Sequence, residues 1–311
     1  MVTLMEGKPV KGKKELTEYI RKLTRKNDKK ILDRLKHGTI PKIASTKHFT
    51  IDFVKNVYKE IRKCELDRIN SMKFDNWEAL NWIIGCKTGG ISEGCKNCCA
   101  LQNGHLISKK NIPIAKLFTE AITIDKNGDP QWSGKIIENP FAFDKKEISK
   151  AGTSRNFLIS YDGEIAFASE DMLFKILKKI CEYPVHNFMF LTELPNILFD
   201  KMLIATNRLK KYGININKIN NIHVGVSVQN NKYKYKIDEL RKFKKFGFAL
   251  HIWHKPLIGP IIYPCYDGIS SIRINCEKGK NKREYKQSWV DNIITEATKQ
   301  GIQIYSDLKK D

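Results

Sequence analysis

The chain has 311 residues, 41% of them hydrophobic, which is enough to bury a full core in one large domain or two. Lys and Arg outnumber Asp and Glu by 56 to 34, a formal net charge of +22. The longest apolar runs fall far short of the roughly 20 residues of a transmembrane helix, and lysines follow the first few residues where a signal peptide has its apolar core. These features argue against a membrane or secreted protein, so we expect a soluble protein of the cytoplasm.

Residues 1–75 form a basic segment with helical periodicity. Leu16, Ile20 and Leu23 recur at helical spacing among charged residues, and Thr50 can cap a second amphipathic helix. The segment holds 20 Lys or Arg against 10 Asp or Glu. Such a charge can bind nucleic acid by releasing condensed counterions, or it can be a solvated basic face that has no partner. The pattern predicts a basic helical extension and leaves both interpretations open.

From residue 76 onward, short apolar runs alternate with amphipathic stretches, which indicates an α/β domain with a parallel sheet. Ser169, followed by two acidic residues and an apolar stripe that ends near Ile180, predicts a helix between two strands. Six to eight such units would curl into a partial or complete parallel β/α barrel over residues 76–311, with its chemistry at the carboxyl ends of the strands. The predicted strands are residues 82–84, 157–160, 188–191, 223–228, 248–253, 271–275 and 302–305.

Residues 85–100 hold four of the eight cysteines and directly follow the first of these strands. Thiolates are soft ligands for iron–sulfur clusters, zinc or copper, and the glycines of this stretch let a loop aim several sulfurs at one centre. We expect Cys86, Cys95 and Cys98 to hold a [4Fe-4S] cluster. Because three cysteines leave one iron without a protein ligand, the amino and carboxylate groups of S-adenosylmethionine can chelate that iron. An electron delivered there releases a deoxyadenosyl radical.

Cys99 keeps two alternatives open. Together with Cys86, Cys95 and Cys98 it could complete a tetrahedral zinc site, and all four cysteines could also stay without a metal. Adjacent cysteines point apart in extended backbone, whereas a Cys-x-x-Cys turn converges naturally. The spacing therefore favours the three-cysteine cluster over zinc.

The cysteine stretch, with Trp77 and Trp82 ahead of it, resembles the glycine-cysteine, serine-x-glycine-cysteine, x-x-cysteine-tyrosine-alanine signature of a phage-type, three-cysteine, radical-SAM-like family. The likeness covers residues 77–308 and implies a barrel fold, radical chemistry and, for a phage-encoded protein, the host cytoplasm. Four later segments resemble motifs of that family in the same order. They are residues 156–162 (a strand ending in serine and aspartate), 190–195 (leucine-threonine-lysine-x-proline), 223–229 (glycine-valine-serine-valine-glutamate) and 255–260 (glutamate-proline-leucine-leucine-glycine-proline).

The sequence also departs from that family pattern. The gap between Cys86 and Cys95 is two residues longer, and the glycine-rich segment near residues 275–279 is eroded. Cys99 replaces the tyrosine after the third cysteine, while Gln229 and Lys255 each replace a glutamate. The loss of two carboxylates implies either a changed substrate or an inactive protein that keeps the cluster as a fold element.

The resemblance implies a set of cofactor-binding residues at the strand ends. Asp162 and Glu164 lie where radical-SAM proteins hold the methionyl ammonium group, although Asp-Gly is also a common turn pair. Polar side chains that close successive strands could bind the ribose or the carboxylate of the cofactor, or could be ordinary caps. These are Ser160, Thr192, Ser227 and Gln229.

His251 and His254 flank Trp253 at another predicted strand end. Histidines in this position can transfer a proton and an aromatic ring can stack on a base, so we take both as candidate catalytic residues. Structural histidines are the alternative.

These patterns together predict a radical S-adenosylmethionine enzyme that modifies a nucleobase in DNA, RNA or a nucleotide precursor. Nucleic acid or a nucleotide is then the expected partner, together with an electron donor. The alternative is a non-catalytic nucleic-acid-binding protein in which zinc or an Fe–S cluster only ties the loop together. A peptide or protein substrate is a third possibility.

Overall fold

The computed structural model describes residues 77–143, 148, 154–277, 281–306 and 308. The chain divides into two units, Met1–Lys73 and Phe74–Asp311, and all described residues belong to the second. The predicted basic helical extension lies outside the described residues. Among the helices that the structure describes, none is long and apolar enough to cross a membrane.

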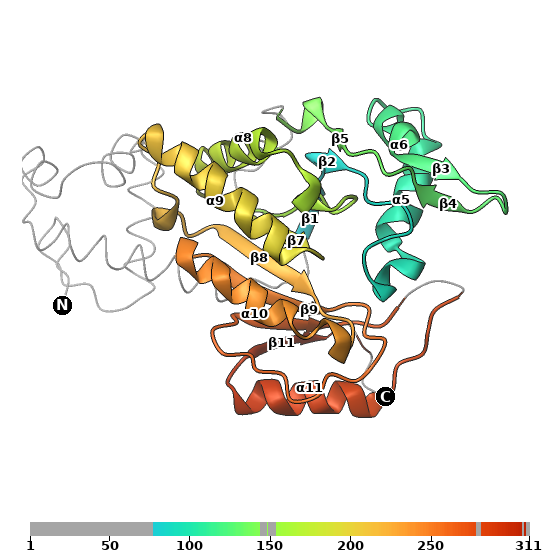
Figure 1. Ribbon diagram of the computed structural model, residues 1–311, viewed down its shortest axis with the longest axis vertical. Coiled ribbons are helices and arrows are strands. Elements are labelled where there is room, and N and C mark those ends of the chain that lie inside the picture. Colours follow the sequence, from blue (N-terminus) through green and yellow to red (C-terminus); the bar gives the residue numbers. More distant parts are fainter. Residues whose placement is uncertain (1–76, 144–147, 149–153, 278–280, 307, 309–311) are drawn as a thin grey trace, which may run out of the picture. The chain divides into compact units, whose positions relative to one another are not determined.

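A seven-stranded sheet forms the centre of this unit, and all of its strand pairs are parallel. It curls into a half-barrel, so the predicted parallel β/α barrel is confirmed in its partial form (Figure 1). Successive strands are neighbours throughout. In spatial order they are β1 (Trp77–Leu80), β6 (Asn156–Ile159), β7 (Asn187–Thr192), β8 (Ile222–Ser227), β9 (Ala249–His254), β10 (Ser271–Ile274) and β11 (Gln303–Ser306).

The first strand is displaced from its predicted position. Residues 82–84 are a fully buried apolar run, and such a run predicts an interior strand. The structure instead places Trp77–Leu80 at the edge of the sheet, where Glu78 and Ala79 are exposed. β2 (Ile83–Ile84) follows the bend after β1 and pairs antiparallel with β5 (Ile137–Glu138).

Helices after the strands cover the outer face of the half-barrel (Figure 1). They are α8 (Glu170–Cys181), α9 (Pro195–Lys211), α10 (Lys236–Arg241) and α11 (Gln287–Lys299), with the 3-10 turns η3 (Ile165–Phe167), η4 (Ile216–Lys218), η5 (Asn231–Tyr233) and η6 (Lys242–Phe246) between them. A smaller substructure lies between β2 and β6. It contains η1 (Glu93–Asn97), α5 (Cys99–Ser108), α6 (Ala115–Ala121), the hairpin of β3 (Ile122–Ile124) and β4 (Pro130–Trp132), and η2 (Pro140–Phe143).

Helix α8 begins where the sequence predicts it. The Ser169 side chain accepts a hydrogen bond from the Met172 N–H, and Glu170 and Asp171 follow at the positive end of the helix dipole. Met172, Leu173, Ile176, Leu177 and Ile180 are buried along one face. This face packs against the sheet and against α9, which fixes the order of the layers.

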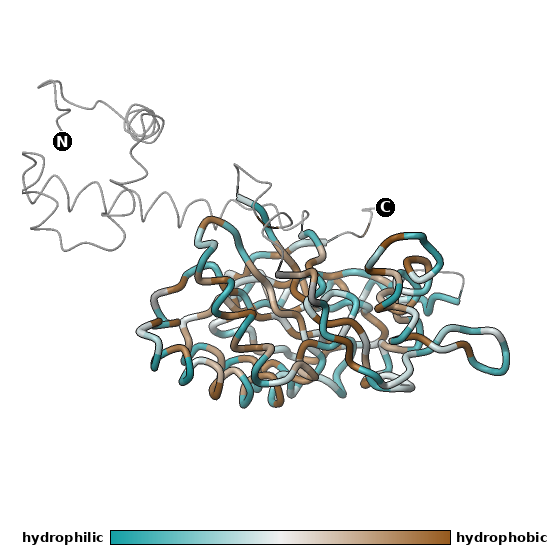
Figure 2. Tube along the Cα trace, turned by 90° about the horizontal axis from the view of Figure 1, so that it is seen from above, coloured by the Kyte–Doolittle hydropathy of each residue, from teal (hydrophilic) through white to brown (hydrophobic). Residues whose placement is uncertain are grey.

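The two faces of the sheet have different surroundings because side chains alternate along each strand. Phe188, Val224 and Leu250 belong to the main core beneath the helices. Met189 and Trp253, from the alternate positions, belong to a separate cluster on the concave face. Figure 2 shows hydrophobic stretches along the interior and hydrophilic stretches at the outer loops. The carboxyl ends of the strands border the concave face, and the predicted site residues lie near these ends.

Candidate iron–sulfur and cofactor site

The cysteine loop begins at Gly85, which is fastened to the loop after β6. The Gly85 N–H donates to the carbonyl of Asp162 at 3.2 Å, and the Glu164 N–H donates to the carbonyl of Gly85 at 3.1 Å. Gly85 has φ of +112°, and a Cβ there would lie 2.2 Å from the carbonyl oxygen of Lys135. Only glycine fits this position, so the fold itself sets where Cys86 leaves the strand.

Backbone amides surround the sulfurs of the next two cysteines. The N–H groups of Ile91 and Ser92 donate to Sγ of Cys95 at 3.4 and 3.5 Å. Cys98 is the N-cap of α5, and its sulfur accepts the Leu101 N–H at 3.5 Å. Amide donors and a helix N-terminus both stabilise negative charge on sulfur. Hydrogen bonds of this kind tune iron–sulfur clusters, so these donors fit cluster ligands.

Burial raises the pKa of Cys98 to about 12, and burial together with the nearby Glu164 carboxylate raises the pKa of Cys86 well above its usual range. The sulfurs of Cys95 and Cys98 also raise the pKa of Cys86, so the three thiols lie within electrostatic reach of one another. A buried thiolate needs a positive partner, and a metal centre supplies one when it replaces the proton.

Within the described residues, no three His, Cys, Asp or Glu side chains converge closely enough to hold a single metal ion. A cubane cluster, in which each thiolate binds its own iron atom, does not need that convergence. The donor chemistry of Cys86, Cys95 and Cys98, with the amides on two of the sulfurs, fits a cluster.

Cys99 has a different environment from the three predicted ligands. It is exposed at the first position of α5, and its sulfur lies 3.4 Å from the hydroxyl of Tyr161. Tyr161 follows the end of β6, and burial raises the pKa of its hydroxyl. The side chain of Cys99 therefore contacts the loop after β6.

Asp162 is buried and joins three segments. Its carboxylate accepts hydrogen bonds from the side-chain amide of Asn81 at 2.7 Å and from that of Asn103 at 3.1 Å. Burial raises the pKa of Asp162, while these two amides oppose the shift. Asn81 comes from the bend after β1 and Asn103 from α5. Sequence reasoning missed both, because isolated asparagines carry no signal.

Glu164 is buried at the end of the same loop, directly before η3. Its carboxylate accepts hydrogen bonds from the N–H groups of Ala166 at 3.0 Å and Glu193 at 2.8 Å, and from the hydroxyl of Thr192. Burial raises its pKa to about 7, against the lowering effect of these donors. Glu164 and Thr192 thus tie the end of β6 to the end of β7.

Two of the predicted hydroxyls have partners inside the fold. Ser160 is buried in the left-handed region, at φ of +54°, and its hydroxyl accepts the Ile83 N–H at 3.1 Å. The Thr192 hydroxyl accepts the Leu194 N–H at 2.9 Å in addition to its contact with Glu164. Both side chains shape the strand ends that border the cysteine loop.

Gln229 contacts the cysteine loop directly. Its side-chain amide nitrogen donates to Oγ of Ser92 at 3.2 Å and to Oε1 of Glu193 at 2.7 Å. A Cβ at Gly94 would lie 3.0 Å from the Gln229 side chain, so the loop lies closely against it. The side chain is fully buried, and its Oε1 has no hydrogen-bond partner. This acceptor is available to a donor on a bound ligand.

Glu193, Lys236 and Tyr233 complete the network, and sequence reasoning missed all three. Oε2 of Glu193 pairs with Nζ of Lys236 at 2.5 Å, and the Lys236 side chain is only 2% exposed. The same Nζ lies 3.4 Å from the carbonyl of Ser227, a predicted residue that is buried at the end of β8. The Tyr233 hydroxyl accepts the Glu93 N–H of the cysteine loop at 2.9 Å. The sequence feature that could have indicated Glu193 as a site residue is its position directly after Thr192, at the end of a predicted strand.

The structure separates the two predicted catalytic histidines. Because side chains alternate along β9, His251 shares the concave face with Trp253, whereas His254 lies on the helix-covered face. His254 is fully buried, with its ring nitrogens 2.8 Å from the carbonyl of Val228 and 2.9 Å from the hydroxyl of Tyr266. These contacts are those of a structural histidine.

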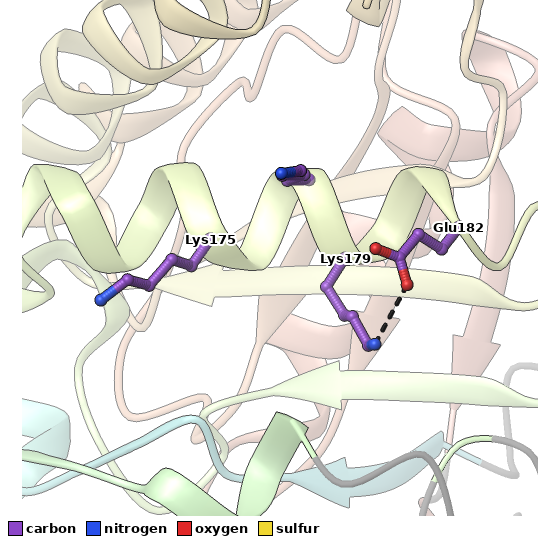
Figure 3. A pocket seen from close by; sticks show the side chains of 4 residues that line it. Lys175, Lys179 and Glu182 are labelled. Carbon is purple, nitrogen blue, oxygen red and sulfur yellow. Dashed lines mark hydrogen bonds and ion pairs between the residues drawn. The ribbon is translucent and has the colours of Figure 1, made fainter. Parts of the chain in front are cut away.

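A shallow hollow on α8 has a different character. It is lined by Lys175, Lys178, Lys179 and Glu182 (Figure 3). Lys179 pairs with Glu182 at 3.0 Å, and Lys175 pairs with Asp171 at 2.7 Å. The hollow is a solvated basic surface of one helix, so lysine substitutions there can serve as a control for the general effect of positive charge on binding.

The family of proteins of unknown function DUF5131 matches residues 74–307, which include the whole half-barrel and the cysteine loop. The chain belongs to this family. No curated protein and no solved structure matches the chain. The DUF5131 match begins and ends within a few residues of the described sheet, and residues 1–73 lie outside it.

Proposed function

We propose that this DUF5131 protein is a radical S-adenosylmethionine enzyme that modifies a nucleobase or nucleotide. Cys86, Cys95 and Cys98 would hold a [4Fe-4S] cluster. The observation that carries the proposal is the position of these thiols on one loop at the carboxyl end of a parallel half-barrel, with amide N–H groups directed at two of the sulfurs.

When bound and reduced by an external one-electron donor, the cluster and S-adenosylmethionine would supply a radical able to abstract an unactivated hydrogen atom. The chain's own residues would bind and orient the cofactor. The unpaired Oε1 of Gln229 would accept a hydrogen bond from the ammonium group or a ribose hydroxyl of the cofactor. Glu193 holds that amide in place through its 2.7 Å contact, and Lys236 fixes Glu193. Burial of this network excludes water from the strand ends.

The net charge of +22 supports a polyanionic partner, since a basic protein attracts nucleic acid over long range. Reduction of a cluster also requires a one-electron donor, so a small electron-transfer protein or a chemical reductant is a necessary partner of the reaction.

Anaerobic reconstitution tests the proposal. The expected product is a brown protein with about four iron and four sulfide per chain, whose paramagnetic spectrum after reduction changes when S-adenosylmethionine is added. A colourless protein with one tightly bound zinc would contradict the proposal and support a structural metal site.

Cysteine variants sharpen the test. Cys86→Ala, Cys95→Ala and Cys98→Ala should each lose most of the iron. Cys99→Ala should keep it, because the Cys99 sulfur contacts Tyr161. Cys181→Ala is the matched control, since this thiol ends α8 and donates to the Leu177 carbonyl at 3.0 Å. A requirement for Cys99 equal to that for the other three would contradict the three-cysteine assignment.

A further inference from the structure

The concave face of the half-barrel carries a layer of aromatic and basic side chains near the strand ends. The strand register aligns Ser227 of β8 with Trp253 of β9, Trp253 with Arg273 of β10, and Arg273 with Tyr305 of β11. Residues aligned in this way point to the same side of a sheet. Trp253 and Tyr305 lie in the concave-face cluster, apart from the main core.

Two cations lie against the Trp253 ring. The guanidinium carbon of Arg273 is 5.5 Å from the ring centroid, and Nζ of Lys255 is also 5.5 Å from it. Both cationic residues are partly exposed, whereas Trp253 is 4% exposed. Cation–π contacts hold basic groups beside an aromatic ring, so this layer places two partly exposed cations around a buried indole.

The indole N–H of Trp253 is buried and has no hydrogen-bond partner. Leaving a buried donor unpaired costs roughly 1–3 kcal/mol, and buried indoles usually find an acceptor. The N–H therefore indicates an acceptor that a ligand brings to the concave face.

A polar chain of side chains continues below this layer. The ring of His251 lies 2.8 Å from Oγ of Ser271 through Nδ1 and 2.9 Å from Nδ1 of His223 through Nε2. The Nε2 of His223 is buried and has no partner. Barrel interiors are normally filled with branched apolar residues. The concave face thus holds a second buried polar atom that lacks its hydrogen bond.

We propose that this concave face binds the phosphorylated nucleoside unit of the substrate, with Trp253 against the base and Arg273 and Lys255 at the phosphate. The inference rests on the proposed function and names residues for its substrate. The unpaired indole N–H of Trp253 can donate to an acceptor on the base, and the two partly exposed cations beside the indole can bind the phosphate. The hydrogen-bonded chain of His223, His251 and Ser271 forms the polar floor of the site. A free nucleotide and a nucleic-acid strand share this chemistry.

Binding measurements on the full-length, cluster-loaded protein test the proposal. Guanosine, cytidine and thymidine are compared with their 5′-monophosphates and with a short single strand of the same bases, by calorimetry. Adenosine is avoided because it is part of S-adenosylmethionine. The monophosphates should bind at least about tenfold more tightly than the nucleosides. If the monophosphate binds as tightly as the strand, the substrate is a free nucleotide. If the strand binds more tightly, the substrate is a nucleic acid.

Four variants separate recognition from structure. Trp253→Ala should weaken nucleoside and monophosphate alike, by roughly tenfold, because it removes the indole N–H donor. Arg273→Met and Lys255→Met should each reduce the advantage of the monophosphate and leave nucleoside binding unchanged, and Arg273→Lys should keep part of that advantage. The double variant Lys175→Met/Lys179→Met, in the hollow on α8, is the control and should change neither constant.

Two results would overturn the proposal. One is the absence of binding of every probe at millimolar concentration. The other is that Trp253→Ala leaves both affinities unchanged and Arg273→Met leaves the ratio of nucleoside to monophosphate affinities unchanged, while both variants lower the melting temperature. Neither result affects the iron content or the response of the paramagnetic spectrum to S-adenosylmethionine, so failure of this site and failure of the cluster are distinguishable.

Discussion

The side-chain amide of Gln229 donates to Oε1 of Glu193 across 2.7 Å, which joins the end of β8 to the end of β7. Lys236 pairs with the other oxygen of the Glu193 carboxylate, and the Gln229 amide also donates to Oγ of Ser92 in the cysteine loop. This part of the site therefore holds one carboxylate and one cation beside the cysteine loop.

Substituting both residues, singly and together, tests this coupling. Glu193→Lys leaves the buried Lys236 facing a second cation and should cost about 3–5 kcal/mol of unfolding free energy. Gln229→Glu places two carboxylates together and should cost about 1–3 kcal/mol. The double variant restores an opposite pair, so its loss should be smaller than the sum by at least about 1 kcal/mol. Denaturant unfolding measures all four proteins.

A surface pair provides the control for that cycle. Lys242 and Glu239 contact each other with side-chain exposures of 50% and 28%. Exchange of these residues should give a coupling energy of about 0–1 kcal/mol, as for other exposed pairs. Equal coupling in both cycles would contradict the special role of the pair at the strand ends.

The position of the cysteine loop depends on the left-handed backbone conformation of Gly85. Gly85→Ala would place Cβ 2.2 Å from the Lys135 carbonyl oxygen at a φ of +112°. The loop must then shift, and Cys86 with it, so we expect a loss of at least about 2 kcal/mol and less iron per chain after reconstitution. Gly89→Ala is the matched control. Gly89 also has positive φ, at +75°, but a Cβ there meets nothing within 4 Å. It should cost about 1 kcal/mol and keep the iron.

Apart from β1, the strands of the sheet could be predicted from the sequence, because they lie in short apolar runs that alternate with amphipathic stretches. Helix α8 was equally clear, since its cap, charges and apolar stripe all agree. The substructure between β2 and β6 could not be predicted. Its strands have only two or three residues, too few to show a period.

The candidate site was only partly visible in the sequence for a related reason. Spacing reveals Cys86, Cys95 and Cys98, because a Cys-x-x-Cys turn is a local feature. The partners of Asp162 are not local, since Asn81 and Asn103 lie 81 and 59 residues away along the chain. The separation of His251 from His254 follows from strand alternation and could have been predicted once the strand bounds were known.

His254 should make the protein sensitive to acid. Burial lowers its pKa to about 4 in the folded protein, from 6.5. The unfolded chain therefore binds more protons between these values, and the stability that neutral His254 contributes is lost as the pH falls from 6.5 toward 4. His254→Gln should cost about 1–3 kcal/mol at pH 7.5, and this cost should shrink by about 2 kcal/mol at pH 5. Unfolding measured across this range checks the difference. A cost that does not vary with pH would contradict a buried, neutral imidazole.

Glu164 should act in the opposite direction. Burial raises its pKa to about 7 from 4.5. Between these values the folded protein binds the extra proton, so the stability from protonated Glu164 is present below pH 4.5 and is lost as the pH rises through 7. The loss amounts to about 3 kcal/mol.

Glu164→Gln removes the titration, so the stability of the variant relative to the native protein should rise between pH 5 and pH 8. Thr192→Val is the companion variant, because it deletes the hydroxyl that donates to Glu164 but leaves the carboxyl in place. It should shift the pH dependence to higher pH, since loss of a donor raises the pKa further. Identical pH profiles for Glu164→Gln and the native protein would show that this carboxyl is already ionised in the fold.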